Sequence, residues 1–77
     1  MSAVKVLSDL PAGAQATIQA IRSGAKDSQR LKEMGLLPGT PITLVRWAPL
    51  GDPVEIRLRG YCLSIRRDQA DQIEVIC

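Results

Sequence analysis

One segment, residues 54–65, restricts the possible folds of this chain more than any other. Its apolar residues alternate with charged ones before Gly60, the pattern of a strand with one buried face. If Arg59 and Gly60 form a two-residue turn, a second strand returns antiparallel to the first. The buried face then holds the pairs Leu58 with Tyr61, Ile56 with Leu63, and Val54 with Ile65, and the outer face holds Arg57 with Cys62 and Glu55 with Ser64. We therefore expect a hairpin with Tyr61 in the core and Cys62 outside it.

Three further strands are expected around this hairpin. Polar and apolar residues alternate in Ala16–Ile21, as in a half-buried strand. Ile42–Trp47 also has strand character, but its alternation slips between Leu44 and Val45, which indicates a β-bulge. Ile73–Ile76 is the last predicted strand. Because a bulge bends a strand, the slip favours a closed or strongly coiled sheet.

Two helical segments are expected between the strands. The longer covers Gln29–Met34, with Ser23 or Asp27 as its N-cap. The shorter is a single turn over Asp68–Gln72, capped by Asp68. Neither segment is long enough to form a layer of its own, so the sheet has to provide most of the core.

The longer helix is expected to end at a glycine and to be followed by a reversal. Gly35 fits the left-handed position after the last helical turn, where Leu36 would contact Leu31 in a Schellman closure. In the next four residues Pro38 stands second and Gly39 third, the order of a type II turn. The third residue of such a turn needs a positive φ, which glycine tolerates.

Five short strands and one short helix predict a mainly β fold, a small five-stranded barrel that forms a single domain over residues 1–77. A chain of 77 residues buries only about 60% of the surface that its extended form exposes. Since the chain contains no Phe, the side chains of Leu, Ile and Val have to fill this thin core.

The composition argues against several functional classes. Histidine, the commonest general base and metal ligand, is absent, so an enzyme is not expected. A net charge of +2 without a block of basic residues does not indicate a nucleic-acid partner. No apolar run is long enough to span a membrane, and Cys62 and Cys77 are too few for a disulfide framework. We therefore expect a cytoplasmic protein with reduced thiols.

No metal site or cofactor is predicted. The residues that could bind a divalent cation have no recognisable ligand spacing: Asp68, Asp71, Glu74, Cys62 and Cys77. Five arginines gather in the sheet region: Arg46, Arg57, Arg59, Arg66 and Arg67. They could form a patch for an acidic partner, but Glu55 interrupts it and a solvated face of mixed charge explains it more simply.

The loop Ala48–Pro53 is the most distinctive candidate for docking. Its two prolines and one glycine fix its shape, and Leu50 has little neighbouring chain to bury it. Asp52 is expected to hold the turn through its own backbone. Trp47 precedes the loop and either joins Leu50 in an exposed docking surface or fills the end of the barrel. The residues alone leave both interpretations open.

Four motifs stand in a specific order: Met34–Gly39 (MGLLPG), Arg46 with Ala48–Val54 (APLGDPV), Arg59–Tyr61 (RGY) and Leu63–Arg66 (LSIR). In this order and spacing they resemble the FeoA family of ferrous iron transport accessory proteins over nearly the whole chain. The resemblance implies a small SH3-like barrel in the cytoplasm that works with FeoB, a membrane Fe(II) transporter with a cytosolic GTP-binding domain. Trp47, Cys62 and Cys77 match no motif of the family, so no family role passes to them.

The resemblance and the loop together predict docking to the cytosolic side of a FeoB-like transporter, without nucleic acid and without direct insertion into the membrane. The candidate partner-binding residues are Trp47, Pro49, Leu50, Gly51, Asp52, Pro53 and Arg57. The residues expected to have a structural role are Gly35, Pro38, Gly39 and Gly60. Two alternatives are a stand-alone SH3-like interaction module, similar to the C-terminal domains of metal-dependent repressors, and a weak Fe(II) carrier. The missing histidines argue against the carrier.

Overall fold

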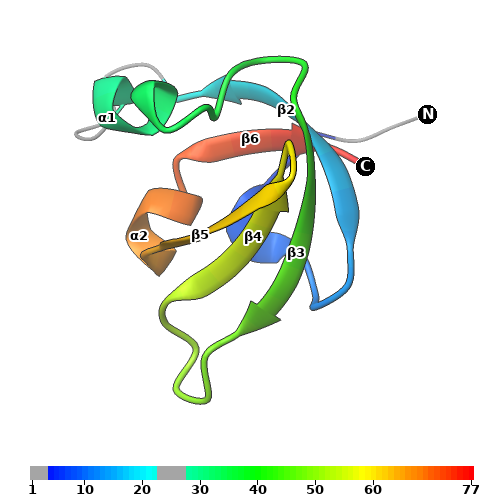
Figure 1. The fold of residues 1–77 in the computed structure, drawn as a ribbon, viewed down its shortest axis with the longest axis vertical. Helices are drawn as coiled ribbons and strands as arrows, with labels where there is room; N and C mark the ends of the chain where they lie inside the picture. The colour runs from blue at the N-terminus through cyan, green and yellow to red at the C-terminus, as the bar shows by residue number, and fades with distance from the viewer. Residues whose placement is uncertain (1–3, 23–27) are drawn as a thin grey trace.

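The computed structural model describes residues 4–22 and 28–77, which form one strongly coiled antiparallel sheet with short helices beside it (Figure 1). The strands are β1 (Val4–Val6), β2 (Gln15–Ile21), β3 (Pro41–Trp47), β4 (Val54–Leu58), β5 (Tyr61–Ile65) and β6 (Ile73–Ile76). The helices are the 3₁₀-helix η1 (Leu7–Asp9) and the α-helices α1 (Ser28–Glu33) and α2 (Arg67–Ala70). The strand order is β1-β6-β2-β3-β4-β5, so β1 and β5 form the two edges of the sheet.

The mainly β fold is confirmed, but the predicted number of strands was wrong. The described residues form six strands, because β1 pairs with β6 through partners such as Val6 and Glu74. A strand of three residues is too short to show a recognisable alternation. Its partner also lies near the other end of the chain, so no local turn announces the pairing. The 3₁₀-helix η1, which directly follows β1, was not predicted either.

A single aliphatic cluster forms the core. Its buried members come from every labelled element except β1: Leu7, Leu10, Ala16, Ile18, Leu31, Leu36, Ile42, Leu44, Val54, Ile56, Leu58, Ile65, Ala70, Ile73 and Val75. Alternate residues of the strands point inward, as in β4, where the three apolar side chains are buried and Arg57 is exposed. All elements that position the loops therefore depend on one shared core.

The predicted register of the β4–β5 hairpin is confirmed at all five pairs, from Leu58 opposite Tyr61 to Val54 opposite Ile65. The predicted bulge in β3 is also confirmed, because the pairing with β4 shifts between Leu44 and Arg46. The turn residues Arg59 and Gly60 both have positive φ, 49° and 83°, as a two-residue hairpin turn of type I′ requires.

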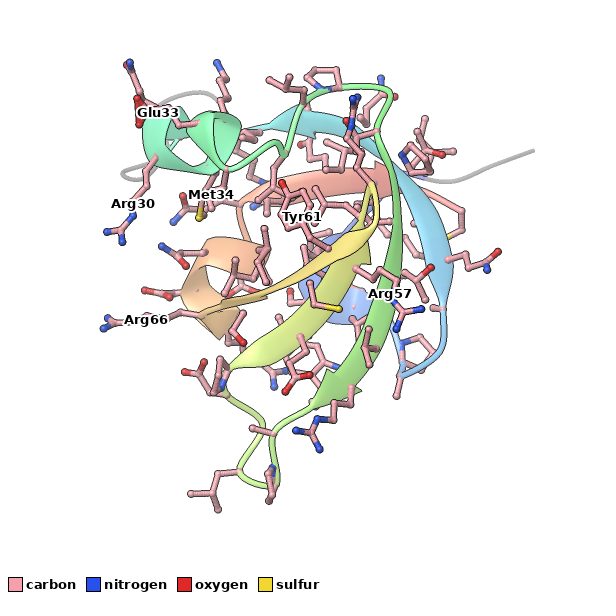
Figure 2. All side chains as sticks on the ribbon, in the orientation of Figure 1. Arg30, Glu33, Met34, Arg57, Tyr61 and Arg66 are labelled. Atoms are coloured by element: carbon pink, nitrogen blue, oxygen red, sulfur yellow. The ribbon has the colours of Figure 1, made fainter. Side chains whose placement is uncertain are left out.

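The core position predicted for Tyr61 was wrong. Its side chain is 44% exposed and lies toward α1, where its hydroxyl donates a hydrogen bond to the carbonyl oxygen of Met34 at 2.5 Å (Figure 2). A phenol buries its ring more easily when its polar tip finds a partner near the surface. Gly35 makes room for this contact, because a Cβ there would lie 2.6 Å from the Tyr61 hydroxyl oxygen. The hairpin turn is thereby attached to the end of α1.

The end of α1 has the predicted Schellman closure. The amide of Leu36 donates to the carbonyl oxygen of Leu31 at 3.1 Å, the amide of Gly35 donates to that of Lys32 at 3.0 Å, and Gly35 has a φ of 99°. Both leucines are buried. The N-caps proposed for this helix, Ser23 and Asp27, lie outside the described residues.

The turn after α1 is of the predicted kind. Gly39 has a φ of 88°, and the amide of Thr40 donates to the carbonyl oxygen of Leu37 at 3.1 Å. The turn leads directly into β3 and also contacts β2, because the amide of Gly39 donates to the carbonyl oxygen of Ile18 at 2.7 Å. Gly39 therefore fixes where β3 begins.

The predicted helical turn near Asp68 exists, but its cap was assigned to the wrong residue. The helix α2 begins at Arg67, with Arg66 in extended conformation before it, and the side chain of Gln69 accepts the Arg66 amide at 3.0 Å. Asp68 lies inside the first turn, where its Oδ1 accepts a hydrogen bond from the amide of Gln69 at 2.9 Å. A carboxylate stabilises a helix both as its N-cap and inside its first turn. The sequence position of Asp68 therefore did not distinguish a cap from a first-turn residue.

Candidate functional site

The candidate site is the loop Ala48–Pro53, which projects between β3 and β4 at one end of the sheet (Figure 1). Two hydrogen bonds close it on itself. The amide of Gly51 donates to the carbonyl oxygen of Ala48 at 2.7 Å, and the amide of Ala48 donates to that of Pro53 at 3.0 Å. Together with the two prolines, these bonds hold the loop in one shape.

Leu50 lies at the tip of this loop and is 97% exposed. The prediction that it lacks neighbours is therefore confirmed. The neighbouring Pro49 is exposed as well. A leucine held out by a hydrogen-bonded turn presents apolar surface at a place where the fold itself gains nothing from it.

The sequence predicted that Asp52 holds the turn through its own backbone, and this was wrong. Its Oδ1 instead accepts the amide of Arg67 at 3.1 Å, at the first residue of α2. The first amides of a helix lack intrahelical partners, and a carboxylate is well suited to accept them. Asp52 thereby ties the base of the loop to α2, a contact between residues fifteen positions apart.

Trp47 supports the loop from inside. Its indole Nε1 donates to the carbonyl oxygen of Leu10 at 3.1 Å, and the partly buried ring packs against the core. The guanidinium of Arg67 lies 5.1 Å from the ring centroid, within the range of a cation–π contact. Of the two interpretations of Trp47, the structure favours the one in which it fills the end of the barrel. Leu50 is thus the large exposed apolar side chain of this loop, with the exposed Pro49 and Pro53 near it.

Arg57 is not part of the loop surface. It lies on the outer face of β4 opposite Cys62 of β5 and Thr43 of β3, three residues beyond Val54, where β4 begins. At about 3.4 Å per residue, it is about 10 Å along the strand from the base of the loop. The structure therefore does not bring together all the predicted partner-binding residues.

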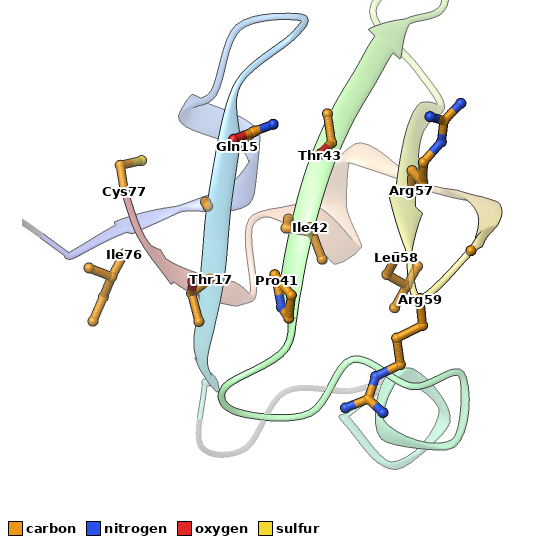
Figure 3. Close-up of a pocket in the computed structure, with 12 residues that line it drawn as sticks. Gln15, Thr17, Pro41, Ile42, Thr43, Arg57, Leu58, Arg59, Ile76 and Cys77 are labelled. Atoms are coloured by element: carbon orange, nitrogen blue, oxygen red, sulfur yellow. The ribbon is translucent and has the colours of Figure 1, made fainter.

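A shallow groove of about 480 Å³ crosses the outer face of the sheet beside Arg57 (Figure 3). Gln15, Thr17 and Thr43 line it between β2 and β3. Arg57 and Arg59 flank it on β4 and on the turn that follows, and their guanidinium groups point away from each other (Figure 3). The groove therefore lacks the convergent charges that would fix one small anion.

The five arginines do not form a continuous patch. The Nη2 of Arg46 lies 2.9 Å from Oε1 of Glu55, across β3 and β4. This hydrogen bond, together with the negative charge of Glu55, raises the pKa of Arg46 above its ordinary value. Arg67 is engaged with Trp47, as described above. Arg57, Arg59 and Arg66 have no carboxylate within 4 Å among the described residues.

The possible metal ligands do not converge. In the part of the chain that the structure describes, no three side chains of Cys, Asp or Glu gather as a metal site would require. Asp71 accepts the hydroxyl of Ser8, and Glu74 lies 3.7 Å from Arg22. Cys62 and Cys77 are exposed free thiols.

None of the helices in residues 4–22 and 28–77 is long and apolar enough to cross a membrane.

Comparison with protein families gives a match to the FeoA domain over residues 5–77. Among curated proteins, the Fe(2+) transport protein A/Fe(2+) transporter FeoB fusion protein of Porphyromonas gingivalis is 44% identical over 69 residues. This match includes 90% of the present chain but only 8% of the fusion protein, so the chain corresponds to a small part of that relative.

Solved structures give the same assignment. The FeoA-like protein from Clostridium acetobutylicum has a TM-score of 0.90 at 33% identity, over 97% of this chain and 87% of that one. The FeoA of Stenotrophomonas maltophilia complexed with zinc, a prokaryotic SH3 domain protein, has a TM-score of 0.78 over 92% and 88% of the two chains. At 23% identity this second likeness shows the fold alone, which is SH3-like.

Proposed function

The chain belongs to the FeoA family, and we propose that it is a cytoplasmic accessory protein of ferrous iron uptake that docks to the cytosolic side of a FeoB-type membrane transporter. The fusion of FeoA and FeoB in the Porphyromonas gingivalis relative supports this partnership. Fusion keeps two domains at a high effective concentration, which favours their interaction. The proposed role is binding rather than catalysis.

The observation that carries this proposal is the contrast between the exposed tip of the Ala48–Pro53 loop and its fixed base. Leu50 is 97% exposed, whereas Asp52 and Trp47 are hydrogen-bonded to other parts of the fold. A loop that is already rigid loses little conformational entropy when it binds. We propose that Leu50 enters an apolar pocket on the transporter and that Pro49 and Pro53 flank it. Gly51, Asp52 and Trp47 hold the shape, and Arg57 remains a candidate contact outside the loop.

The test is the binding of purified FeoB to the wild type and to Leu50→Ala. Since Leu50 packs against almost nothing in the free protein, its truncation should leave the melting temperature nearly unchanged. Binding should weaken by about 1 to 2 kcal/mol, the scale of a modest hot spot, which is about tenfold in Kd. Leu37→Ala is the matched control, because Leu37 is also exposed, at 44%, but lies on the turn after α1.

Two outcomes would contradict the proposal. If Leu50→Ala unfolds the domain, the loop is a structural element. If Leu50→Ala and Leu37→Ala weaken FeoB binding equally or not at all, the docking surface lies elsewhere. Measurement with and without guanine nucleotide would also show whether the GTP-binding domain of the transporter affects the contact.

A further inference from the structure

The strand β5 is an edge that the fold leaves open. Exposed edges invite pairing with other chains, and natural proteins protect them by short length, charge, proline, a bulge or a covering element. The opposite edge, β1, is three residues long and contains Lys5. In contrast, β5 is five residues long, Tyr-Cys-Leu-Ser-Ile, without a charged residue or a proline, and its pairing with β4 contains no bulge.

Two residues of β5 direct their backbone groups away from β4. In an antiparallel hairpin, pairs that exchange hydrogen bonds alternate with pairs that do not, beginning from the pair that closes the turn. Leu58 and Tyr61 close this turn, so Cys62 and Ser64 belong to the pairs that do not bond across the hairpin. Both residues are exposed, and their backbone groups have no partner in the loops and turns of the described chain. They offer two amides and two carbonyls to an added strand.

A groove of about 500 Å³ runs beside this edge, between β5, α1 and α2. Its apolar lining comes from Met34, Ile65 and Pro53, so side chains of an added strand could be partly buried there. Gln72 also lines the groove, and its Oε1 is buried without a hydrogen-bond donor among the described residues.

The charge around the edge selects the kind of partner. Arg30 and Arg66 line the groove from α1 and from the end of β5, and both extend outward on the same side of the molecule (Figure 2). Arg59 lies at the other end of the edge, and none of these three arginines has a carboxylate within 4 Å among the described residues. Asp68 is the one carboxylate among the described residues that line the groove, so this part of the lining is net positive. A partner segment with negative charge is favoured.

The same charges disfavour a second copy of this chain. If two β5 strands paired antiparallel about Leu63, Arg66 after the end of one strand would come near Arg59 in the turn before the other. Like charges brought close together at an interface disfavour association. We therefore propose that β5 and the adjoining groove bind an extended acidic segment of a partner protein, which adds a strand to the sheet. This surface is separate from the Ala48–Pro53 loop tip, and the inference does not depend on the identity of the transporter.

The experiment is an NMR titration of the protein with a synthetic pool of short peptides in which Glu or Asp alternates with Val, Ile or Thr. The amides of Cys62 and Ser64 should shift and exchange with solvent more slowly, because they become hydrogen-bonded. A matched pool with Lys in place of the acidic residues should leave them unchanged. Added salt should weaken the binding of the acidic pool, because it screens the attraction between opposite charges.

Two variants test the edge and the charge separately. Ser64→Pro removes an outward amide without loss of a hydrogen bond to β4, since proline is tolerated on an edge strand whose N–H faces solvent. Arg66→Glu reverses a charge without change in the strand. Each variant should bind the acidic pool at least fivefold more weakly than the wild type. The control Lys5→Glu, at the opposite edge, should bind it as the wild type does. A melting curve shows whether Ser64→Pro folds, and if it does not, Arg66→Glu decides.

The proposal is overturned if the acidic pool changes neither the amide signals of Cys62 and Ser64 nor their exchange with solvent. It is equally overturned if the lysine pool binds as well as the acidic pool. It is also overturned if these amides are already protected without peptide in a concentration-dependent way, because β5 then pairs with a second copy. None of the three substitutions lies in the Ala48–Pro53 loop. Failure here would therefore leave the Leu50 experiment unaffected, and the reverse also holds.

Discussion

Gly39 and Thr40 stand side by side in the turn before β3 but respond to opposite physical demands. Gly39 needs a φ of 88°, which a β-branched side chain adopts poorly, so Gly39→Val should lower the free energy of unfolding. Thr40 is 1% exposed, and its Oγ1 has no hydrogen-bond partner among the described residues. Thr40→Val keeps the shape and removes a buried hydroxyl, so it should raise the free energy of unfolding by about 1 kcal/mol.

Urea unfolding of the two variants and the wild type checks this pair. The expected order of midpoints is Gly39→Val lowest, wild type intermediate and Thr40→Val highest. Equal midpoints for the two variants would contradict the type II turn. A lower midpoint for Thr40→Val would mean that the Thr40 hydroxyl forms a hydrogen bond, for example to an ordered water.

Ile56 shows how much a single core position contributes in so small a domain. It is completely buried, and its cross-strand partners are Leu44 on β3 and Leu63 on β5. Ile56→Ala should therefore lower the free energy of unfolding by about 2 to 5 kcal/mol, which is a large part of the stability of a small domain. The neighbouring Arg57→Ala, on the outer face, is the control and should change the urea midpoint little. Coincident melts of Ile56→Ala and the wild type would disprove the register.

At the scale of secondary structure elements, the contact between Asp52 and α2 decides whether the loop base is fixed. Asp52→Ala removes the acceptor of the Arg67 amide and should lower stability by about 1 kcal/mol, as the loss of a helix cap does. Asp52→Asn keeps an acceptor oxygen, so it should lower stability much less than Asp52→Ala. Thermal unfolding followed by circular dichroism measures both variants. If Asn and Ala are equally destabilising, the negative charge rather than the hydrogen bond stabilises α2.

Elements built from neighbouring residues were the ones that the sequence predicted. The β4–β5 hairpin and the end of α1 depend on glycine positions and on alternation within a few residues, and both have the predicted geometry. In contrast, β1 has three residues and gains its stability from β6, more than sixty positions away. Tyr61 was misplaced for a related reason, because its hydroxyl partner, the carbonyl of Met34, lies 27 positions away in the turn that follows α1. Tertiary contacts of this kind leave no periodic signal in the sequence.

The candidate site was predictable to the same extent. The exposure of Leu50 follows from the turn residues on both sides of it, so the sequence was sufficient to select it. The roles of Asp52 and Trp47 were not predictable, because their partners, the Arg67 amide and the Leu10 carbonyl, are brought near only by the fold. The open edge at β5 also required the strand order, since a hairpin strand can lie at an edge or inside a sheet.

At the scale of the whole molecule, one core cluster joins η1, both α-helices and the strands β2–β6. Every buried apolar residue of the described chain belongs to this cluster, so no part of the described chain has a core of its own. A domain of this kind is expected to unfold in one cooperative transition. The single tryptophan makes this testable, because it reports on the end of the barrel from which the docking loop projects.

We therefore expect the urea transition measured by Trp47 fluorescence to coincide with the one measured by far-ultraviolet circular dichroism. Trp47 contacts the core and is hydrogen-bonded to Leu10, so its surroundings should be lost only when the sheet is lost. Leu50→Ala should leave both curves in place, whereas Asp52→Ala should move them together by the same amount. A fluorescence transition at lower urea would show that the end of the barrel opens on its own. The loop would then not be preorganised, and the low entropic cost assumed for docking would not apply.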